Sequence, residues 1–377
     1  MIDSEFTCEV VKIIALDPIP GADKVEVAKF VFADGNIPDY QCVVGKGQFT
    51  IGATAIYISD DSLVPVSRAE FEFLKDRLDY KGTPYYRIRA AKIRGVVSTG
   101  MLLSVDSSKY PRGLSLGTEM QNVLGVTKYE SPAEKAAVER FVPEGKGLLF
   151  KFRKWLNKKL YKPVNVPTYS VVSLRKVPTY FEKDEPVYFT EKIHGSNIRF
   201  GKVNGKIYIG SHHVEKSDSR GWLLRKLFPG KKNKPGFYGT DVWSAWFYRK
   251  FPTSNHWDQL PNNVVFYGEL YGPGIQPNYD YGLQYTDVKV FDAYDVKAKR
   301  WLSHLETNLL LPGSINLVDI GRPLQFNVEL LRAEAEANST VGAPGRTNNI
   351  REGIVVRSVD WNKAGKHVSS RYLTSKH

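Results

Sequence analysis

The sequence predicts an α+β protein in which short antiparallel strands dominate and helices are few. Segments rich in Val, Ile, Tyr and Phe occur within residues 1–105 and again within residues 186–377, and a less regular stretch, residues 106–185, separates them. The chain has 377 residues, which is more than one typical domain of roughly 100–200 residues. We therefore expect two sheet-rich domains joined by a connecting region.

The N-terminal region is expected to form a small closed β-barrel. Turn signals such as Pro18-Ile-Pro-Gly-Ala-Asp and Asp34-Gly-Asn separate its apolar segments. Five short strands in roughly a hundred residues are typical of such a barrel, although a sandwich without a binding role has the same periodicity. The expected strands are Glu5–Leu16, Lys24–Phe32, Tyr40–Val44, Ala53–Ser59 and Tyr86–Met101.

The connecting region contains two segments with helical features. Ser131–Phe141 opens with Ser-Pro-Ala-Glu, a capping arrangement with proline in the first turn. Lys151–Lys162 holds six basic residues and no acidic one, with its apolar residues at helical spacing. This segment is either a surface helix packed through its aromatic side chains or a patch that contacts phosphates, and the sequence favours neither.

Strands dominate again in the C-terminal region. Asn204-Gly205, between two apolar segments, is a strong β-hairpin signal. The stretch 215–263, which contains several Trp and Lys residues, is expected to be an exposed loop. The expected strands are Val187–Lys192, Asn197–Val203, Lys206–Ser211, Val264–Tyr271, Val288–Val296 and Gly353–Arg357.

Composition limits the classes of function. The 53 basic and 40 acidic residues give a net charge of +13, and the commonest reason for such an excess is a polyanionic partner. Two cysteines, Cys8 and Cys42, cannot staple a fold of this size and fit a reducing compartment. No apolar run approaches the about 18 residues of a membrane span, and the N-terminus lacks the features of a secretory signal. We expect a cytoplasmic monomer that contacts no membrane.

The segment Thr190-Glu-Lys-Ile-His-Gly-Ser-Asn197 carries the clearest chemical signal. Lys192 ends an apolar strand, and a lysine amine is a nucleophile only when it is neutral. Apolar surroundings or a neighbouring cation would favour that neutral form. Gly195 would let the backbone turn tightly beside a ligand. Taken alone, this short pattern also fits a solvated lysine at a strand end.

Carboxylates in other apolar strands strengthen the signal. Glu269 lies within Phe266-Tyr-Gly-Glu-Leu-Tyr-Gly272, and Glu352 lies at the start of Arg351-Glu-Gly-Ile-Val-Val-Arg357. Such a carboxylate is costly to bury unless it is ion-paired or bound to a metal. An aromatic strand, Val288–Val296, and a lysine in Gly365–Leu373 complete a set of residues suited to nucleotidyl transfer. Plain ion pairing within the strands is the alternative role for both glutamates.

Together these residues resemble the covalent nucleotidyltransferase superfamily. Lys-x-His-Gly, Gly-Glu-Leu-Tyr-Gly, Phe-x-x-Tyr-Asp, Glu-Gly-Ile-Val-Val and Lys-x-Val-Ser follow one another in the order of its motifs I, III, IIIa, IV and V. Histidine in the first motif is typical of nick-sealing RNA ligases. The segments Ile19–Val27 and Arg94–Leu103 resemble the OB domain of one branch of these ligases.

The resemblance covers most of the chain except 151–162 and 215–263. It implies an N-terminal OB-like β-barrel followed by a nucleotidyltransferase domain of the ATP-grasp-like adenylation type, built from antiparallel sheets with flanking helices.

The resemblance implies a role for each residue of the first motif. Lys192 would attack the α-phosphorus of ATP, expel pyrophosphate and hold AMP through a phosphoramide bond. Glu191 would meet adenine through its backbone. His194 and Asn197 would orient the phosphate or a metal-bound water near the nucleophile.

The later motifs would complete the nucleotide and metal site. Glu269 would contact the ribose or a metal, Glu352 would hold the catalytic divalent ion, and Lys366 would neutralise the α-phosphate. Phe291 would stack on adenine, with Tyr294 as a close alternative. Carboxylate, water and phosphate oxygens suit a hard dication, so Mg²⁺ or Mn²⁺ is expected.

Two departures from the family pattern leave questions open. The arginine that the family often places shortly after the nucleophile is replaced by Ser211, His212 and His213, so either a histidine or Arg220 would contact phosphate. The last motif often has two lysines close together, and here Lys363 is the weaker second candidate beside Lys366.

The function that the resemblance implies is ATP-dependent RNA ligation. The enzyme would join 3′-hydroxyl and 5′-phosphate ends of RNA, or of duplexes that contain RNA, through lysyl-AMP and an adenylylated 5′ end, at nicks in a duplex. Two alternatives remain: a GTP-dependent capping-type nucleotidyltransferase, and a nucleic-acid-binding protein with a degenerate pocket.

Overall fold

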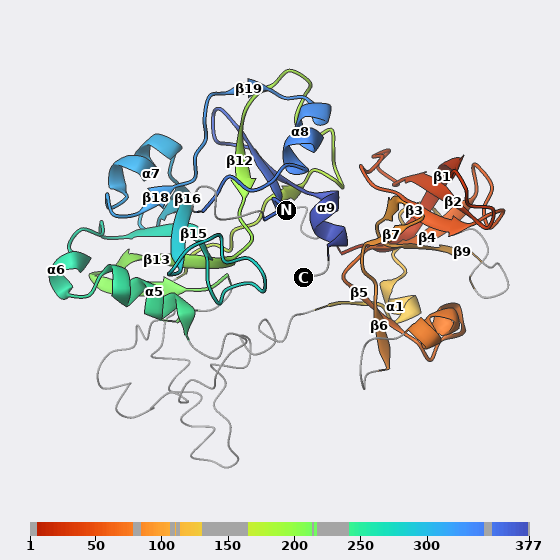
Figure 1. Cartoon of the computed structure of the whole chain (residues 1–377), viewed down its shortest axis with the longest axis horizontal. Coiled ribbons are helices and arrows are strands. Elements are labelled where there is room, and N and C mark those ends of the chain that lie inside the picture. Colours follow the sequence, from red (N-terminus) through yellow and green to blue (C-terminus); the bar gives the residue numbers. More distant parts are fainter. Residues whose placement is uncertain are drawn as a thin grey trace, which may run out of the picture.

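The computed structural model describes residues 6–77, 84–105, 110, 114–129, 165–212, 215–216, 241–342 and 349–375. It confirms the expected α+β fold, with an OB-like barrel followed by a second sheet-rich domain (Figure 1). The segments 131–141 and 151–162, for which helices are expected, lie outside the described residues. Within the described ranges, every helix is too short or too polar to span a membrane.

The N-terminal barrel is built around the long strand β1. Residues Cys8–Lys12 of β1 pair with β4, and Lys12–Pro18 pair with β2, with a bulge near Ile13 where the strand bends. One long strand therefore forms hydrogen bonds with two different neighbours along its length. A five-stranded sheet has the order β3-β2-β1-β4-β9, a three-stranded sheet the order β10-β5-β6, and β7 and β8 form a hairpin. The bounds are β1 Cys8–Pro18, β2 Val25–Val31, β3 Cys42–Gly45, β4 Thr54–Ile58, β5 Ser62–Pro65, β6 Tyr85–Arg87, β7 Ala91–Ile93, β8 Val96–Ser98, β9 Met101–Ser104 and β10 Thr127–Lys128, with a 3₁₀ helix at Ala69–Arg77 and α1 at Gln121–Leu124.

Both faces of the central barrel strands are buried. Val10 packs on one side against Phe71, whereas its neighbour Val11 packs on the other side against Phe30 and Tyr57. This explains why the apolar residues of β1 occur in consecutive pairs, Val10-Val11 and Ile13-Ile14, instead of strictly alternating with polar residues.

The expectation of a single strand at Tyr86–Met101 is wrong. The chain forms four short strands there, β6 to β9. Arg94 and Gly95 both have positive φ angles, 49° and 86°, and turn the chain back to form the β7–β8 hairpin. Gly100, with φ of 78°, then turns the chain into β9.

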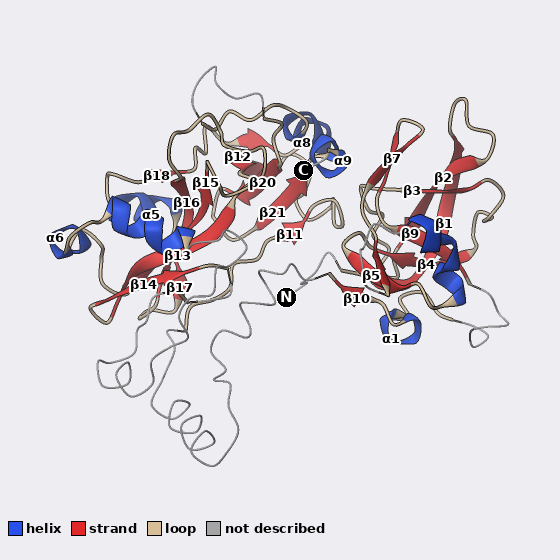
Figure 2. Cartoon of the chain, turned by 60° about the horizontal axis from the view of Figure 1, so that its bottom comes forward, coloured by secondary structure: helices blue, strands red, loops and turns tan. Residues whose placement is uncertain are grey.

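The second domain consists of two mainly antiparallel sheets, each with one parallel strand pair, and short helices around them (Figure 2). The first sheet has the order β11-β21-β20-β12-β19, and the second the order β14-β13-β15-β16-β17, with β18 beside β16. The strands are β11 Val172–Ser173, β12 Pro186–Lys192, β13 Ser196–Val203, β14 Lys206–Gly210, β15 Val264–Tyr271, β16 Asp287–Asp295, β17 Arg300–Trp301, β18 Asn316–Leu317, β19 Leu324–Gln325, β20 Gly353–Ser358 and β21 Ala364–Val368. The helices are α5 Val242–Lys250, α6 Ser254–Trp257, α7 His304–Leu310, α8 Val328–Ala335 and α9 Ser370–Thr374.

The chain crosses from one sheet to the other directly after Lys192. Strand β12 of the first sheet ends at Lys192, and β13 of the second sheet begins at Ser196. The expected hairpin at Asn204-Gly205 is present, with positive φ at both residues joining β13 to β14.

The stretch 215–263 is not simply an exposed loop, which corrects the expectation for its second half. Helices α5 and α6 occupy 242–257, and the side chains of Trp243, Trp246 and Phe247 are buried in the core of the second sheet. Asp241 caps α5 by accepting from the backbone N–H of Ser244. These three aromatic residues therefore belong to the core, while 217–240 lies outside the described residues.

A polar interface joins the barrel to the second domain. Asp39, in the loop before β3, accepts two hydrogen bonds from the Arg332 guanidinium of α8, at 3.0 and 2.6 Å. The backbone N–H of Asp39 donates to the carbonyl of Arg175, and Lys176 Nζ donates to Thr7 Oγ1 at 2.7 Å. His367 of β21 is buried beside Asp39, with 3.9 Å between Nδ1 and Oδ2.

Substituting His367 by Gln should make the protein less sensitive to acid. Burial and the nearby Arg175 cation lower the pKa of His367 from 6.5 to about 4, against the attraction of Asp39. Between these two values the unfolded chain binds a proton that the folded chain does not, so stability falls as the pH falls through this window. The free energy of unfolding from urea titrations at pH 7 and pH 4.5 should therefore drop less in His367→Gln than in the wild type. An equal drop in both proteins would contradict this assignment.

Candidate active site

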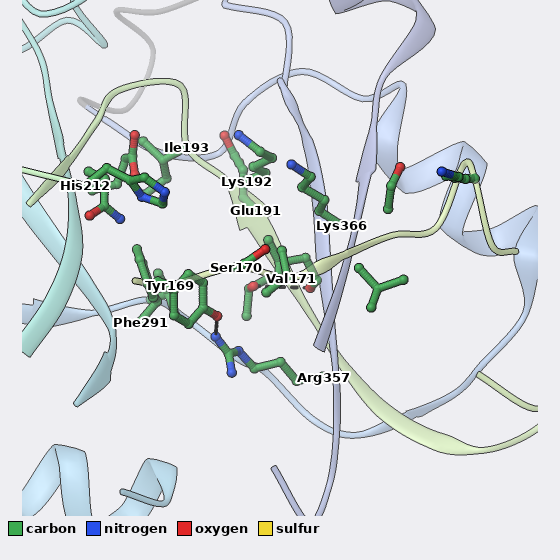
Figure 3. A pocket seen from close by; sticks show the side chains of 18 of the residues that line it. Tyr169, Ser170, Val171, Glu191, Lys192, Ile193, His212, Phe291, Arg357 and Lys366 are labelled. Atoms are coloured by element: carbon green, nitrogen blue, oxygen red, sulfur yellow. Dashed lines mark hydrogen bonds between the residues drawn. The ribbon is translucent and has the colours of Figure 1, made fainter. Parts of the chain in front are cut away.

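A pocket of about 340 Å³ lies where the two sheets of the second domain face each other (Figure 3). The first sheet contributes Lys192 and Lys366, and the second contributes Asn197, Glu269 and Phe291. Because β12 runs directly into the crossing to β13, the lysine at the end of β12 reaches this space. Figure 3 shows the side chains of Lys192 and Lys366 entering the same pocket. The remaining wall includes residues 169–173 of the connecting region and Lys128 of the barrel.

Lys192 forms an ion pair with Glu352. The distance between Nζ and Oε1 is 2.5 Å, and the two side chains are 25% and 12% exposed. Burial acts to raise the pKa of Glu352, but Lys192 and His194 outweigh it and hold that pKa at about 2. Glu352 is therefore ionised and favours the ammonium form of the lysine. Instead of the cation or purely apolar surroundings expected for an activated lysine, the structure shows a carboxylate at its side.

Glu269 lines the pocket, close to Lys192, and has the opposite electrostatic character to Glu352. It faces Asn197 across the β13–β15 pair. Burial raises the pKa of Glu269 to about 8 against the attraction of Lys192, and the charge of Glu352 adds to the rise. The site thus contains one carboxylate that stays ionised and one that takes up a proton near neutral pH.

The oxygen atoms in the pocket fit a hard cation that brings its own water or phosphate ligands. Asn197 Oδ1 is buried and accepts no hydrogen bond from the described residues, so it is an acceptor whose partner a bound group would supply. The described part of the chain holds no cluster of three or more His, Cys, Asp or Glu residues arranged to bind a metal. Two carboxylates and an amide oxygen are too few for a closed metal cage, but Mg²⁺ binds in this partial manner beside phosphates.

His194 lies on the far side of Glu352 from Lys192. Its Nδ1 is 3.7 Å from Glu352 Oε2. Its backbone N–H donates to the hydroxyl of Tyr281 at 2.8 Å, and its ring is surrounded by Tyr279 and Tyr372. The structure therefore places His194, the histidine of the first motif, against the carboxylate of Glu352.

Phe291 reaches the pocket because β16 has a bulge there. The pairing of β15 with β16 shifts register between Tyr267 and Gly268, so Phe291 has no directly opposite residue. Phe291 lines the pocket and packs against Tyr169, with 4.7 Å between ring centroids. Tyr294, the alternative stacking residue, does not line the pocket and packs against Trp301.

Two residues of this wall, Tyr169 and Arg357, are absent from the site expected from the sequence. The Arg357 guanidinium is buried, forms an ion pair with Asp292 at 2.5 Å and contacts the Tyr169 hydroxyl (Figure 3). An arginine in the apolar strand Gly353–Arg357 is itself a signal, because a buried cation requires a partner. Tyr169 gives no comparable signal, since its neighbours in sequence show no periodic pattern.

The remaining predicted residues take different places. His212 lines the pocket, while His213 and Arg220 lie outside the described residues. The Glu191 carboxylate accepts from the backbone N–H of Thr340 at 2.8 Å and pairs with Arg351 at 3.3 Å, so its side chain anchors a neighbouring loop.

Lys363 does not lie in the pocket, which corrects its assignment to nucleotide binding. Its Nζ pairs with Glu185 at 3.0 Å and lies over the ring of Phe181. Lys363 is three residues before Lys366, at the turn that precedes β21, and the alternation of side chains along the strand does not bring the two amines together.

Comparisons with known proteins agree with this architecture. A family model described as RNA ligase matches residues 185–370, and a second, described as an OB-fold domain, matches residues 7–105. No curated protein matches the chain.

Solved structures of an RNA ligase from Naegleria gruberi are similar over nearly the whole chain. A Lys-to-Ala mutant with ATP and Mn has a TM-score of 0.71 and 21% identity, covering 97% of this chain and 98% of that chain. The same ligase with PPi has a TM-score of 0.71 and 21% identity, covering 98% of both chains. A Glu-to-Ala mutant with AMP and Mn has a TM-score of 0.67 and 20% identity, covering 98% of both. At this identity the likeness shows a shared fold.

Substituting Gly195 by Ala should disrupt the crossing between the two sheets. A Cβ atom at Gly195 would overlap the carbonyl oxygen of Leu270 and lie 2.8 Å from Glu269 Cγ. Overpacking of this kind costs about 1–3 kcal/mol, which thermal unfolding should detect. Gly313→Ala is the matched control, because a Cβ there meets no atom within 4 Å. Equal melting temperatures for the two variants would contradict the proposed constraint.

Proposed function

We propose that this chain, whose residues 185–370 belong to the RNA ligase family and follow an OB-fold domain, is an ATP-dependent RNA ligase. It would join a 3′-hydroxyl to a 5′-phosphate, at nicks in a duplex that contains RNA. The observation that carries this proposal is the position of Lys192 in a pocket between two sheets, paired with Glu352 and accompanied by Lys366. The similar ligase from Naegleria gruberi has been solved with ATP and Mn, with AMP and Mn, and with PPi.

In the first step, Lys192 Nζ forms a bond to the α-phosphorus of ATP, and the bond between that phosphorus and the pyrophosphate oxygen breaks. The ammonium must first lose a proton, so the contact with Glu352 has to loosen when the nucleotide binds. Glu352, Glu269 and Asn197 would hold a divalent ion such as Mg²⁺ or Mn²⁺. When bound, this ion would supply positive charge that stabilises the phosphates in the transition state.

The other pocket residues would position the nucleotide. Phe291 and Glu191 both line the pocket; the Phe291 ring would stack on the base, and the backbone of Glu191 would contact the edge of the base. Lys366 lines the same pocket and would neutralise charge that develops on the α-phosphate. His212 takes the place of the missing arginine as a phosphate contact.

The later steps would use the nucleic-acid ends. AMP is transferred from Lys192 to the 5′-phosphate, and the 3′-hydroxyl then attacks this activated phosphate and releases AMP. The OB-like barrel and the net charge of +13 suit a single strand or a duplex end that carries many phosphates. Recognition of A-form geometry and 2′-hydroxyls would favour RNA on the 3′ side of the nick.

Incubation with α-labelled nucleotide and a divalent ion tests the proposal and both alternatives. Wild-type protein should carry label from ATP through a denaturing gel, and Lys192→Ala should carry none, because the phosphoramide bond forms on that amine. Label from GTP alone would indicate a capping-type enzyme. An absence of label from either nucleotide would indicate a binding protein and would overturn the proposal.

Lys366→Ala should slow the formation of lysyl-AMP by about a hundredfold, because it removes a positive charge aimed at the reacting phosphate. Lys363→Ala is the matched control, since Lys363 lies outside the pocket and pairs with Glu185. Quenched-flow measurement of label incorporation gives both rates. A similar slowing in the two variants would show that the pocket does not define the phosphate site.

A further inference from the structure

Tyr372 joins the candidate active site from a helix that follows the last motif. Its hydroxyl lies 3.1 Å from Nδ1 and 3.2 Å from Nε2 of His194. The two rings meet edge to face, with centroids 5.0 Å apart and an interplanar angle of 72°. Since His194 lies against Glu352 and Glu352 pairs with Lys192, a continuous series of contacts runs from Tyr372 to the nucleophile.

Helix α9 holds Tyr372 in a fixed place despite its short length. The carboxylate of Glu336 accepts from the backbone N–H groups of Ser370 and Arg371, at 2.6 and 3.0 Å. The Arg175 guanidinium donates to Ser370 Oγ at 3.0 Å and to the carbonyl of Val368 at 3.1 Å. These bonds attach α9 to the C-terminal end of α8 and to Arg175 of the connecting region, which also holds the end of β21, so the position of the Tyr372 hydroxyl is well defined.

The tyrosines around His194 hold different parts of it. Tyr281 accepts from the backbone N–H of His194 and donates to its carbonyl. Tyr279 packs its ring edge to face against the imidazole at 4.7 Å, but its hydroxyl donates to the carbonyl of Ile350. Tyr372 places its hydroxyl on the imidazole nitrogens. Burial and the nearby Glu352 raise the pKa of Tyr372 well above its ordinary value, so this hydroxyl keeps its proton.

We propose that Tyr372 is a positioning residue that orients the His194 imidazole beside Glu352. The inference rests on the proposed function, because the orientation matters only if Lys192 and Glu352 carry the chemistry. The imidazole can turn about its bond to Cβ, and an aromatic edge alone does not select one orientation. The Tyr372 hydroxyl lies within hydrogen-bond distance of both ring nitrogens, so it limits how far the ring can turn and thereby keeps His194 in contact with Glu352.

Tyr372→Phe tests this role, with Tyr279→Phe as the matched control. Both variants remove one hydroxyl from the same aromatic cluster, but only the first hydroxyl contacts the imidazole in the structure. Single-turnover rates of lysyl-AMP formation and of nick sealing should first identify the step that slows in His194→Ala. We expect Tyr372→Phe to slow that same step about fivefold, which is the size expected from one lost hydrogen bond. The KM for ATP should stay within about twofold of the wild-type value.

A double variant separates positioning from a general loss of structure. If Tyr372 acts through His194, the variant with both His194→Ala and Tyr372→Phe should be no slower than His194→Ala alone. Tyr279→Phe should keep the wild-type rates. A multiplicative loss in the double variant, or equal slowing by Tyr279→Phe, would overturn the proposal.

A spectroscopic measurement keeps the inference testable even if the proposed function fails. The ring ¹⁵N resonances of His194, assigned from the spectrum that loses them in His194→Ala, should shift in Tyr372→Phe and stay in place in Tyr279→Phe. Wild-type protein that forms no lysyl-AMP would refute the proposed function, whereas unchanged His194 resonances in Tyr372→Phe would refute the role of Tyr372.

Discussion

The ion pair between Lys192 and Glu352 is the interaction on which the site depends. Two charged groups are largely withdrawn from water there, and each is tolerable only because the other is present. The pairing of β12 with β20 places Lys192 opposite Gly353, and so brings its amine to Glu352 just before that strand. Because Glu352 stays ionised, it favours the charged form of the lysine beside it. Under the proposed function, nucleotide binding would have to separate this pair, which would couple activation of Lys192 to the presence of ATP.

Much of the fold and the centre of the site could be predicted from the sequence. Strands such as β12, β15 and β20 are apolar runs, and a lysine or glutamate within such a run is conspicuous because burying it is costly. Lys192, Glu269 and Glu352 stand out for this reason, and the structure brings all three together. Gly195 is equally informative, since the short crossing between sheets leaves no space for a side chain.

What could not be predicted depends on contacts between distant parts of the chain. Tyr169 and Lys128 reach the pocket from segments without periodic patterns, and nothing local to Asp39 indicates its pairing with Arg332. Trp243, Trp246 and Phe247 of α5 look like residues of a loop in the sequence. Nothing in the sequence around them indicates that they pack against a face of the second sheet. The sequence ranks Lys363 below Lys366 but leaves both as candidates, and the turn before β21 is what separates their positions.

A crystal structure of the protein after incubation with ATP and Mg²⁺ tests the central claim most directly. The account predicts continuous electron density between Lys192 Nζ and the phosphorus of AMP, with the base against Phe291 and Glu352 moved away from the amine. An unmodified Lys192 still paired with Glu352, with nucleotide bound elsewhere on the chain, would contradict it.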